Sequence, residues 1–182
     1  MHVERRWRPK PRNTAVIALV LVAAACAPAL DWREARPEGT SLVLMFPCRP
    51  HDQERNVALA GAVVPMRMHA CSASGANFAL AALEAGDPAR VTPELAALRG
   101  QLLGNLAGTA TEEHPLALAG STPNPESARV RIVGKRPDGT PVVADAAFFV
   151  RGLTLYQATV LGSDDVPGPK AVGTFFDAIR LL

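Results

Sequence analysis

The 182-residue sequence predicts an α+β domain, in which an antiparallel sheet of about six to seven strands carries helices packed on it. The first observation is that short segments with apolar residues at alternate positions recur along the chain, separated by turn residues such as Gly. The second is a stripe of leucines, at positions 95, 98, 102 and 106, with the spacing of an amphipathic helix. The length accommodates one domain of ordinary size.

Three strands in a meander are predicted in the first half. The apolar run Ser41–Phe46 stops at Pro47, which indicates a buried strand. Val57 and Leu59 alternate with other residues up to a hairpin turn at Ala60-Gly61. In the strand after this turn, one face carries Val64, Met66, Met68 and Ala70, and the other carries Arg67, His69 and Cys71. Residues 76–84 suit either a helix or a strand, and we expect a strand.

The helix of the leucine stripe is predicted to begin with Thr92 as its cap and Pro93 at its first position, and to stop at Gly108. A second helix is expected over residues 170–182, with Val172, Phe175, Phe176 and Ile179 on one face.

Four strands are predicted between the helices, around residues 116–118, 130–132, 142–150 and 153–161. Reversals at Pro137-Asp138-Gly139 and Arg151-Gly152 predict that the last three form an antiparallel meander. Asp145 lies within one of these strands. We expect it to face solvent or to mark an irregularity, because an unpaired buried carboxylate is costly.

The first 25 residues have the pattern of an export signal. A basic segment extends to Arg12, an apolar run covers Ala15–Ala25, and small residues precede Cys26. A membrane-spanning helix needs about 20 apolar residues, so a cleaved signal peptide over 1–25 is favoured over a retained anchor.

Ala23-Ala24-Ala25-Cys26 resembles a lipobox, in which cleavage precedes a cysteine that becomes lipidated, although Ala23 stands where Leu is usual. The alternative is ordinary secretory cleavage that leaves Cys26 with a free thiol. Lipidation predicts an acyl-anchored protein with a flexible tether over 26–40 and a single domain over 41–182. Ala27, by analogy with Gram-negative sorting, predicts the outer membrane, with the domain facing the periplasm. Trp32 either docks on the domain or sits among lipid headgroups.

If Cys26 carries lipid, two cysteines remain, Cys48 and Cys71, in a compartment that permits disulfides. A bridge would stabilise the fold by about 3 kcal/mol through loop closure. Two separate buried thiols are the alternative, since sequence does not show whether the two Cα atoms come within bonding reach.

Phe46-Pro47-Cys48-Arg49-Pro50 is similar to the Phe-Pro-Gly-Lys-Pro opening of many exported bacterial proteins of unknown role, with Cys48 in place of Gly. The penultimate strand and the closing helix of those proteins resemble residues 155–160 and 175–181. The resemblance implies a PsbP/Mog1-like α/β/α sandwich over about residues 41–182. It also implies an accessory or binding module without a catalytic centre.

Two groups of side chains suggest chemistry. Met66, Met68, His69 and Cys71 offer the soft ligands that Cu(I) prefers, but strand alternation places the methionines on the face opposite His69 and Cys71, so no metal site is predicted. His51 and Asp52 could join His69 and Cys71 as the thiol–imidazole centre of a hydrolase. The simpler interpretation is a bridged cysteine and a solvated loop over 51–54. The acidic clusters at 112–114 and 164–165 are also expected to be solvated loops.

Charge argues against nucleic acid as a partner. Five basic residues against Glu4 give the leader a charge of +4, so a whole-chain charge of +2 leaves −2 on the remainder. No catalytic residue and no cofactor is predicted. The function expected is that of a membrane-anchored envelope lipoprotein, a non-catalytic binding or accessory module with an envelope protein as partner. The alternatives are a small thiol- and His-dependent hydrolase or a copper-binding lipoprotein.

Overall fold

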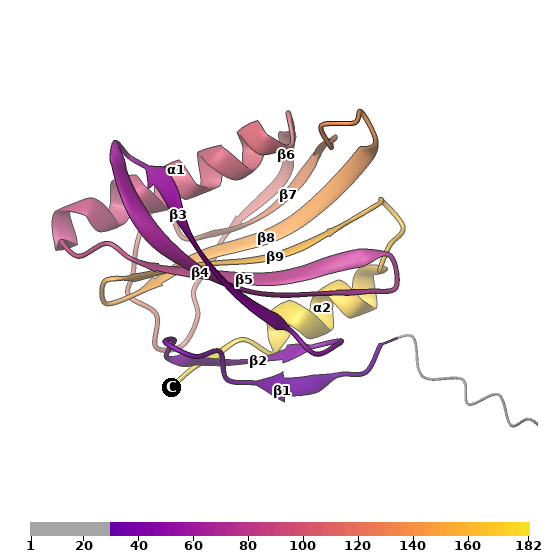
Figure 1. The fold of residues 1–182 in the computed structure, drawn as a ribbon, viewed down its shortest axis with the longest axis horizontal. Helices are drawn as coiled ribbons and strands as arrows, with labels where there is room; N and C mark the ends of the chain where they lie inside the picture. Colours follow the sequence, from indigo (N-terminus) through magenta and orange to yellow (C-terminus); the bar gives the residue numbers. More distant parts are fainter. Residues whose placement is uncertain (1–29) are drawn as a thin grey trace, which may run out of the picture.

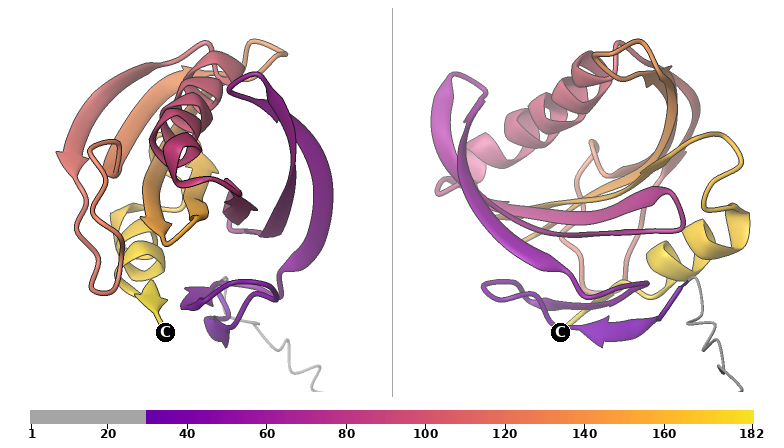
Figure 2. Two further views of the ribbon diagram at one scale, coloured as in Figure 1. Left: turned by 90° about the vertical axis from the view of Figure 1, so that its left-hand side faces the viewer. Right: turned by 45° about the vertical axis from the view of Figure 1, so that its right-hand side comes forward.

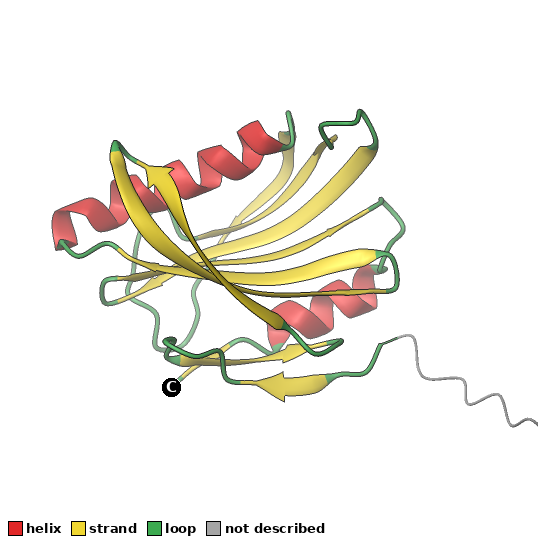
Figure 3. Ribbon diagram, in the orientation of Figure 1, coloured by secondary structure: helices red, strands yellow, loops and turns green. Residues whose placement is uncertain are grey.

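A computed structural model describes residues 30–182 of the chain as a mixed α+β fold (Figure 1, Figure 3). Its main element is a seven-stranded antiparallel sheet with the strand order β3-β4-β5-β9-β8-β7-β6. Its strands are β3 (His51–Leu59), β4 (Ala62–Ala73), β5 (Ala76–Glu84), β6 (Thr109–Pro115), β7 (Ala128–Lys135), β8 (Pro141–Arg151) and β9 (Thr154–Gly162). The predicted sheet of six to seven antiparallel strands is confirmed.

Each face of the sheet is covered by one helix, so the described residues form two hydrophobic cores. The sheet curves around α1 (Pro88–Asn105), which packs on what we call the α1 face (Figure 2). The opposite α2 face packs against α2 (Pro169–Asp177) and a small sheet of β1 (Arg33–Ala35), β2 (Leu42–Phe46) and β10 (Arg180–Leu181). The α1 face is marked by Val64, Val130 and Ala144, and the α2 face by Phe78, Phe149 and Tyr156.

The central strands are apolar on both faces because both faces are covered. In β8, the even-numbered residues from Val142 to Val150 enter the core under α1, while Ala147 and Phe149 enter the core under α2. Aromatic rings concentrate on the α2 face, where the Phe175 ring lies 5.5 Å from the rings of both Phe46 and Phe78. Such edge-to-face contacts add to the free energy of burial.

The two strands at the edges of the large sheet were not predicted correctly. Residues 51–54, expected as a solvated loop, begin β3, and β6 occupies 109–115 where a strand was expected at 116–118. Leu116 and Leu118 follow β6 and pack on the α2 core instead. Edge strands expose most of their side chains, so these segments lack the apolar alternation that marks a half-buried strand.

Helix boundaries also differ from the prediction. Asp87 caps α1 by accepting a hydrogen bond from the Ala89 amide at 2.8 Å, and Pro88 begins the helix, so Pro93 lies inside it. Thr92 is therefore not a cap, and its hydroxyl accepts a hydrogen bond from Asn124 at 2.8 Å. Helix α2 ends at Asp177 rather than continuing to 182, because the next residues leave to pair with β2 as β10.

The folded domain begins before residue 41, which corrects part of the predicted tether. The Asp31 amide donates to the Pro47 carbonyl at 2.8 Å, and β1 pairs with β2. β2 accordingly belongs to the small sheet rather than to a meander with β3 and β4. Trp32 docks on the domain with its ring centroid 6.1 Å from that of Phe78. The predicted signal peptide and Cys26 lie outside the described residues.

Candidate binding site

An open cavity of about 610 Å³ lies over β3 and β4, at one edge of the large sheet. It is lined by Glu38, Gly39, Asp52, Gln53, Glu54, Arg67 and His69. The lining is dominated by charged side chains, and it includes one buried imidazole.

The β3–β4 hairpin places its charged side chains opposite one another on the α2 face. The register pairs Asp52 with His69 and Glu54 with Arg67. The segment before β2 contributes Glu38 and Gly39 to the cavity, and Arg67 lies against Gly39. The backbone at Gly39 has φ +72°, a conformation that favours glycine, and the Arg67 guanidinium lies where a β-carbon would otherwise stand.

His69 is held by a carboxylate but is only half satisfied. Its Nδ1 lies 2.7 Å from Oδ1 of Asp52, and because a carboxylate only accepts, Nδ1–H is the donor. The residue is 4 % exposed, and its Nε2 is buried without a hydrogen-bond partner. Leaving a buried polar atom unpaired costs about 1–3 kcal/mol, which a bound ligand or an ordered water would offset.

The cavity carries an excess of negative charge. Glu38, Asp52 and Glu54 face a single guanidinium, that of Arg67, which lies 3.4 Å from the Glu54 carboxylate. That ion pair is exposed, and so is the carboxylate of Asp52. Exposed pairs add little to stability, so these groups are free to serve a ligand.

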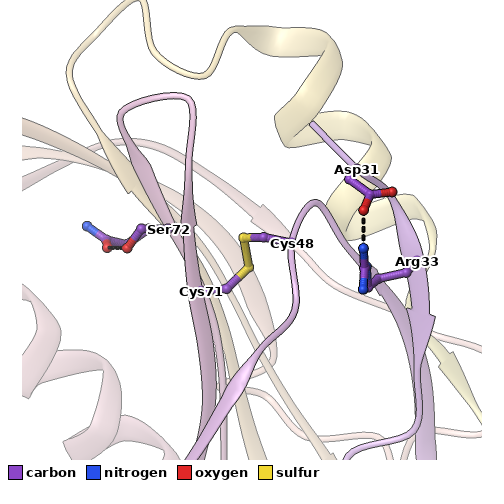
Figure 4. Close-up of a disulfide and its surroundings, with 6 residues drawn as sticks. Asp31, Arg33, Cys48, Cys71 and Ser72 are labelled. Atoms are coloured by element: carbon purple, nitrogen blue, oxygen red, sulfur yellow. Dashed lines mark hydrogen bonds and ion pairs between the residues drawn. A yellow bond between two sulfur atoms is a disulfide. The ribbon is translucent and has the colours of Figure 1, made fainter. Parts of the chain in front are cut away.

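Cys48 and Cys71 form a disulfide with Cα atoms 6.0 Å apart, which is the bridge that the sequence allowed (Figure 4). The bond ties the segment between β2 and β3 to β4, two residues from His69. It occupies the sulfur that the hydrolase hypothesis needs as a nucleophile. His51 is exposed and, by strand alternation, points to the face opposite Asp52, so it does not join His69. Of that hypothetical centre, only the Asp52–His69 pair is assembled.

The proposed copper ligands are separated, as strand alternation predicts. Met66 and Met68 line a groove of about 320 Å³ beside Leu98 and Leu102 of α1, on the α1 face. Cys71 is bridged on the α2 face. Within residues 30–182, no three His, Cys, Asp or Glu side chains are grouped to hold a metal ion.

A second charged cluster lies on the α2 face at the β7–β8 hairpin. Arg131 donates to both Asp145 and Asp164, each at 2.9 Å. Asp145 is thus a half-buried ion-pair partner and neither faces solvent nor marks an irregularity, which corrects the expectation from sequence. Burial raises the pKa of Asp145, while Arg131 and Arg129 oppose this. Burial acts to lower the pKa of Arg131, but the carboxylates of Asp145 and Asp164 prevail and raise it.

The acidic clusters expected in loops differ in their surroundings. Glu112, Glu113 and His114 belong to β6, and Glu113 forms an ion pair with Arg99 of α1. Asp164 and Asp165 do lie in a loop, and Asp164 forms an ion pair with Arg131.

The positions of the predicted turns indicate both cross-strand pairs, Asp52 with His69 and Arg131 with Asp145. In a hairpin, residues equally distant from the turn face each other. The predicted turn at Ala60-Gly61 therefore implies that Asp52 opposes His69, and the turn at 137–139 implies that Arg131 opposes Asp145. The first pairing was missed because residues 51–54 were interpreted as a loop.

No protein-family model matches the chain, and no curated protein matches it significantly. Among residues 30–182, no helix has the length and apolar character needed to cross a membrane.

Proposed function

We propose that the protein is a lipid-anchored lipoprotein of the bacterial envelope whose domain is a non-catalytic binding module of the PsbP/Mog1-like type. The observation that carries the proposal is the charged cavity over β3 and β4 with the buried, half-satisfied His69. An unpaired polar atom next to a cavity is where a ligand gains most from forming a hydrogen bond. The helix-covered antiparallel sheet is compatible with the sandwich that this type implies.

The proposed lipid anchor limits where the domain can work. Asp31, which is already bonded to the domain, lies five positions after Cys26. A fully extended chain of this length spans about 18 Å. An acylated Cys26 would keep the domain close to the membrane surface, so the partner we propose is an envelope protein at that surface. Ala27 supports the outer membrane as the site, with the domain facing the periplasm.

The anchor is tested by mass spectrometry of the protein purified from bacterial membranes, with Cys26→Ser as the control. We expect the wild-type chain to begin at Cys26 with attached acyl chains, and the variant to leave the membrane fraction. Separation of inner from outer membranes then tests the location. A mature chain that still begins at Met1 would contradict both the signal peptide and the anchor.

The binding module is tested by photo-crosslinking in living cells. A photoreactive residue at Asn56, exposed beside Glu54 on the cavity face of β3, should capture a reproducible partner. The same residue at Glu112, on the opposite edge of the sheet, is the matched control. Equal capture at both positions, or none at Asn56, would contradict a partner at this cavity.

A further inference from the structure

We propose that the cavity over β3 and β4 binds a primary ammonium group, which donates to the Nε2 of His69 and to carboxylate oxygen among the acidic side chains of the same walls, Glu38, Asp52 and Glu54. This inference rests on the proposed binding function and names the chemistry of its ligand.

The His69 ring lacks a hydrogen-bond partner at one of its two nitrogens. With Nδ1–H donated to Asp52, the Nδ1–H tautomer of the ring has Nε2 as its acceptor, and that atom has no partner among the described residues. A ligand that completes the ring must bring a donor. An ammonium group brings three N–H donors and no acceptor.

The charge of the cavity walls favours a cation. Three carboxylates line the cavity against the single guanidinium of Arg67, so these four side chains together carry an excess of two negative charges. A cation is attracted to such a site, and a hydrogen bond from a charged donor to a carboxylate is about twice as strong as a neutral one.

The cavity is large enough for an organic ligand. The acidic side chains surround a cavity of about 610 Å³, and within residues 30–182 they do not group closely enough to coordinate a metal ion. An organic ammonium ligand needs only two or three acceptors around its nitrogen, and the rest of the molecule can occupy the remaining volume, so it fits this arrangement better than a metal ion. Arg67 adds a donor at the wall for a carbonyl or carboxylate next to the ammonium group.

The test is a titration followed by NMR of the imidazole nitrogens, using the purified chain in a mild detergent. The probes are Nα-acetyl-lysine methylamide, ethanolamine, tetramethylammonium and acetate. We expect both primary amines to shift the His69 Nε2 signal saturably. Tetramethylammonium, which has the charge but no N–H, should bind at least about tenfold more weakly. The relative affinities of the lysine derivative and ethanolamine distinguish a lysine side chain from a free amine as the source.

Substitutions assign the effect to the cavity walls. The double variant Glu38→Gln with Glu54→Gln should weaken amine binding by about tenfold or more, since each change removes a charge and keeps the shape. Both carboxylates are exposed, so the fold should persist, which the amide spectrum checks. Glu112→Gln makes the same charge change at the opposite sheet edge and should leave the affinity within about twofold.

Three outcomes would overturn the assignment: a shift by acetate but not by amines, equal binding of tetramethylammonium, or no shift with any probe. Each would reject the ammonium ligand. The crosslinking at Asn56 judges the binding module separately, so a partner captured there together with a failed amine titration would reject this inference alone.

Discussion

The α2 face of the sheet holds two charged cross-strand pairs, one near each edge, and they are satisfied very differently. At the β7–β8 hairpin, Arg131 is bonded to Asp145 and to Asp164. At the β3–β4 hairpin, the His69 ring is bonded to Asp52 through Nδ1, and its Nε2 is buried without a partner. A satisfied pair contributes to the fold. A pair that keeps one buried atom unpaired is a cost to the fold, and such costs concentrate at sites of binding.

The largest effect on stability is expected from removing the disulfide that lies next to the Asp52–His69 pair. Replacing Cys48 and Cys71 together by Ala removes a bridge between residues 23 positions apart. We expect a loss of about 3 kcal/mol in the free energy of unfolding, measured by urea denaturation. Wild-type protein under reducing conditions should lose a similar amount. An unchanged midpoint in both would show that the bridge contributes nothing at this edge.

The next largest effect on stability is expected from breaking the ion pair between Arg131 and Asp145. Arg131→Leu leaves Asp145 half-buried with only the nearby charge of Arg129. We expect a loss of about 2 kcal/mol in the free energy of unfolding, because a buried carboxylate is left without its partner. Arg131→Lys keeps the charge and should recover part of the loss. If Arg131→Leu were as stable as the wild type, the β7–β8 pair would not be structural.

The same kind of substitution at the other pair should have a much smaller effect. His69→Leu removes the unpaired Nε2 and leaves Asp52, which is 68 % exposed at its side chain, to be solvated by water. We expect a change within about 1 kcal/mol, with stabilisation as the favoured direction. His114→Leu on exposed β6 controls for the general effect of adding leucine. A loss of more than about 2 kcal/mol at His69 would remove the contrast between the two pairs.

The smallest effect is a pH dependence at Asp145. Burial raises the folded-state pKa of this group, so the folded state holds its proton more tightly than the unfolded chain. The stability linked to Asp145 is therefore fully present in acid and decreases as the pH rises through the raised pKa. Asp145→Asn lacks this linkage, so its stability relative to the wild type should increase with pH across the acid range.

Urea midpoints of the two proteins at a series of acid pH values measure this difference. Asp165→Asn, at an exposed loop position, controls for the loss of one negative charge. A relative stability that decreases with pH would show that the ion pair with Arg131, rather than burial, dominates at Asp145.

Much of the fold could be predicted because the central strands are half or fully buried. The segments around 130–132, 142–150 and 153–161 were assigned correctly as strands, and their antiparallel meander is confirmed. The stretch 76–84 was also predicted as a strand, against the helical propensity of its Ala and Leu residues. Packing on both faces decided these segments, and packing leaves an apolar pattern that can be read along the chain.

The candidate site was only partly predictable. His69, Asp52 and Cys71 were identified as residues of interest, but as parts of a thiol centre that the disulfide excludes. Glu38 and Gly39 were assigned to a tether, and in the structure they form one side of the cavity. Arg67 was noted only for the face on which it lies. Nothing in the local sequence indicates that the segment before β2 approaches β4.

The sequence by itself determined the central strands and the turns between them, because apolar period and turn chemistry are properties of neighbouring residues. Tertiary structure alone decided that the Nε2 of His69 is buried and unpaired and that Arg131 binds a second carboxylate, Asp164, besides Asp145. The burial and the hydrogen-bond partners of a polar atom depend on residues brought near it from distant parts of the chain. That information is absent from any short segment.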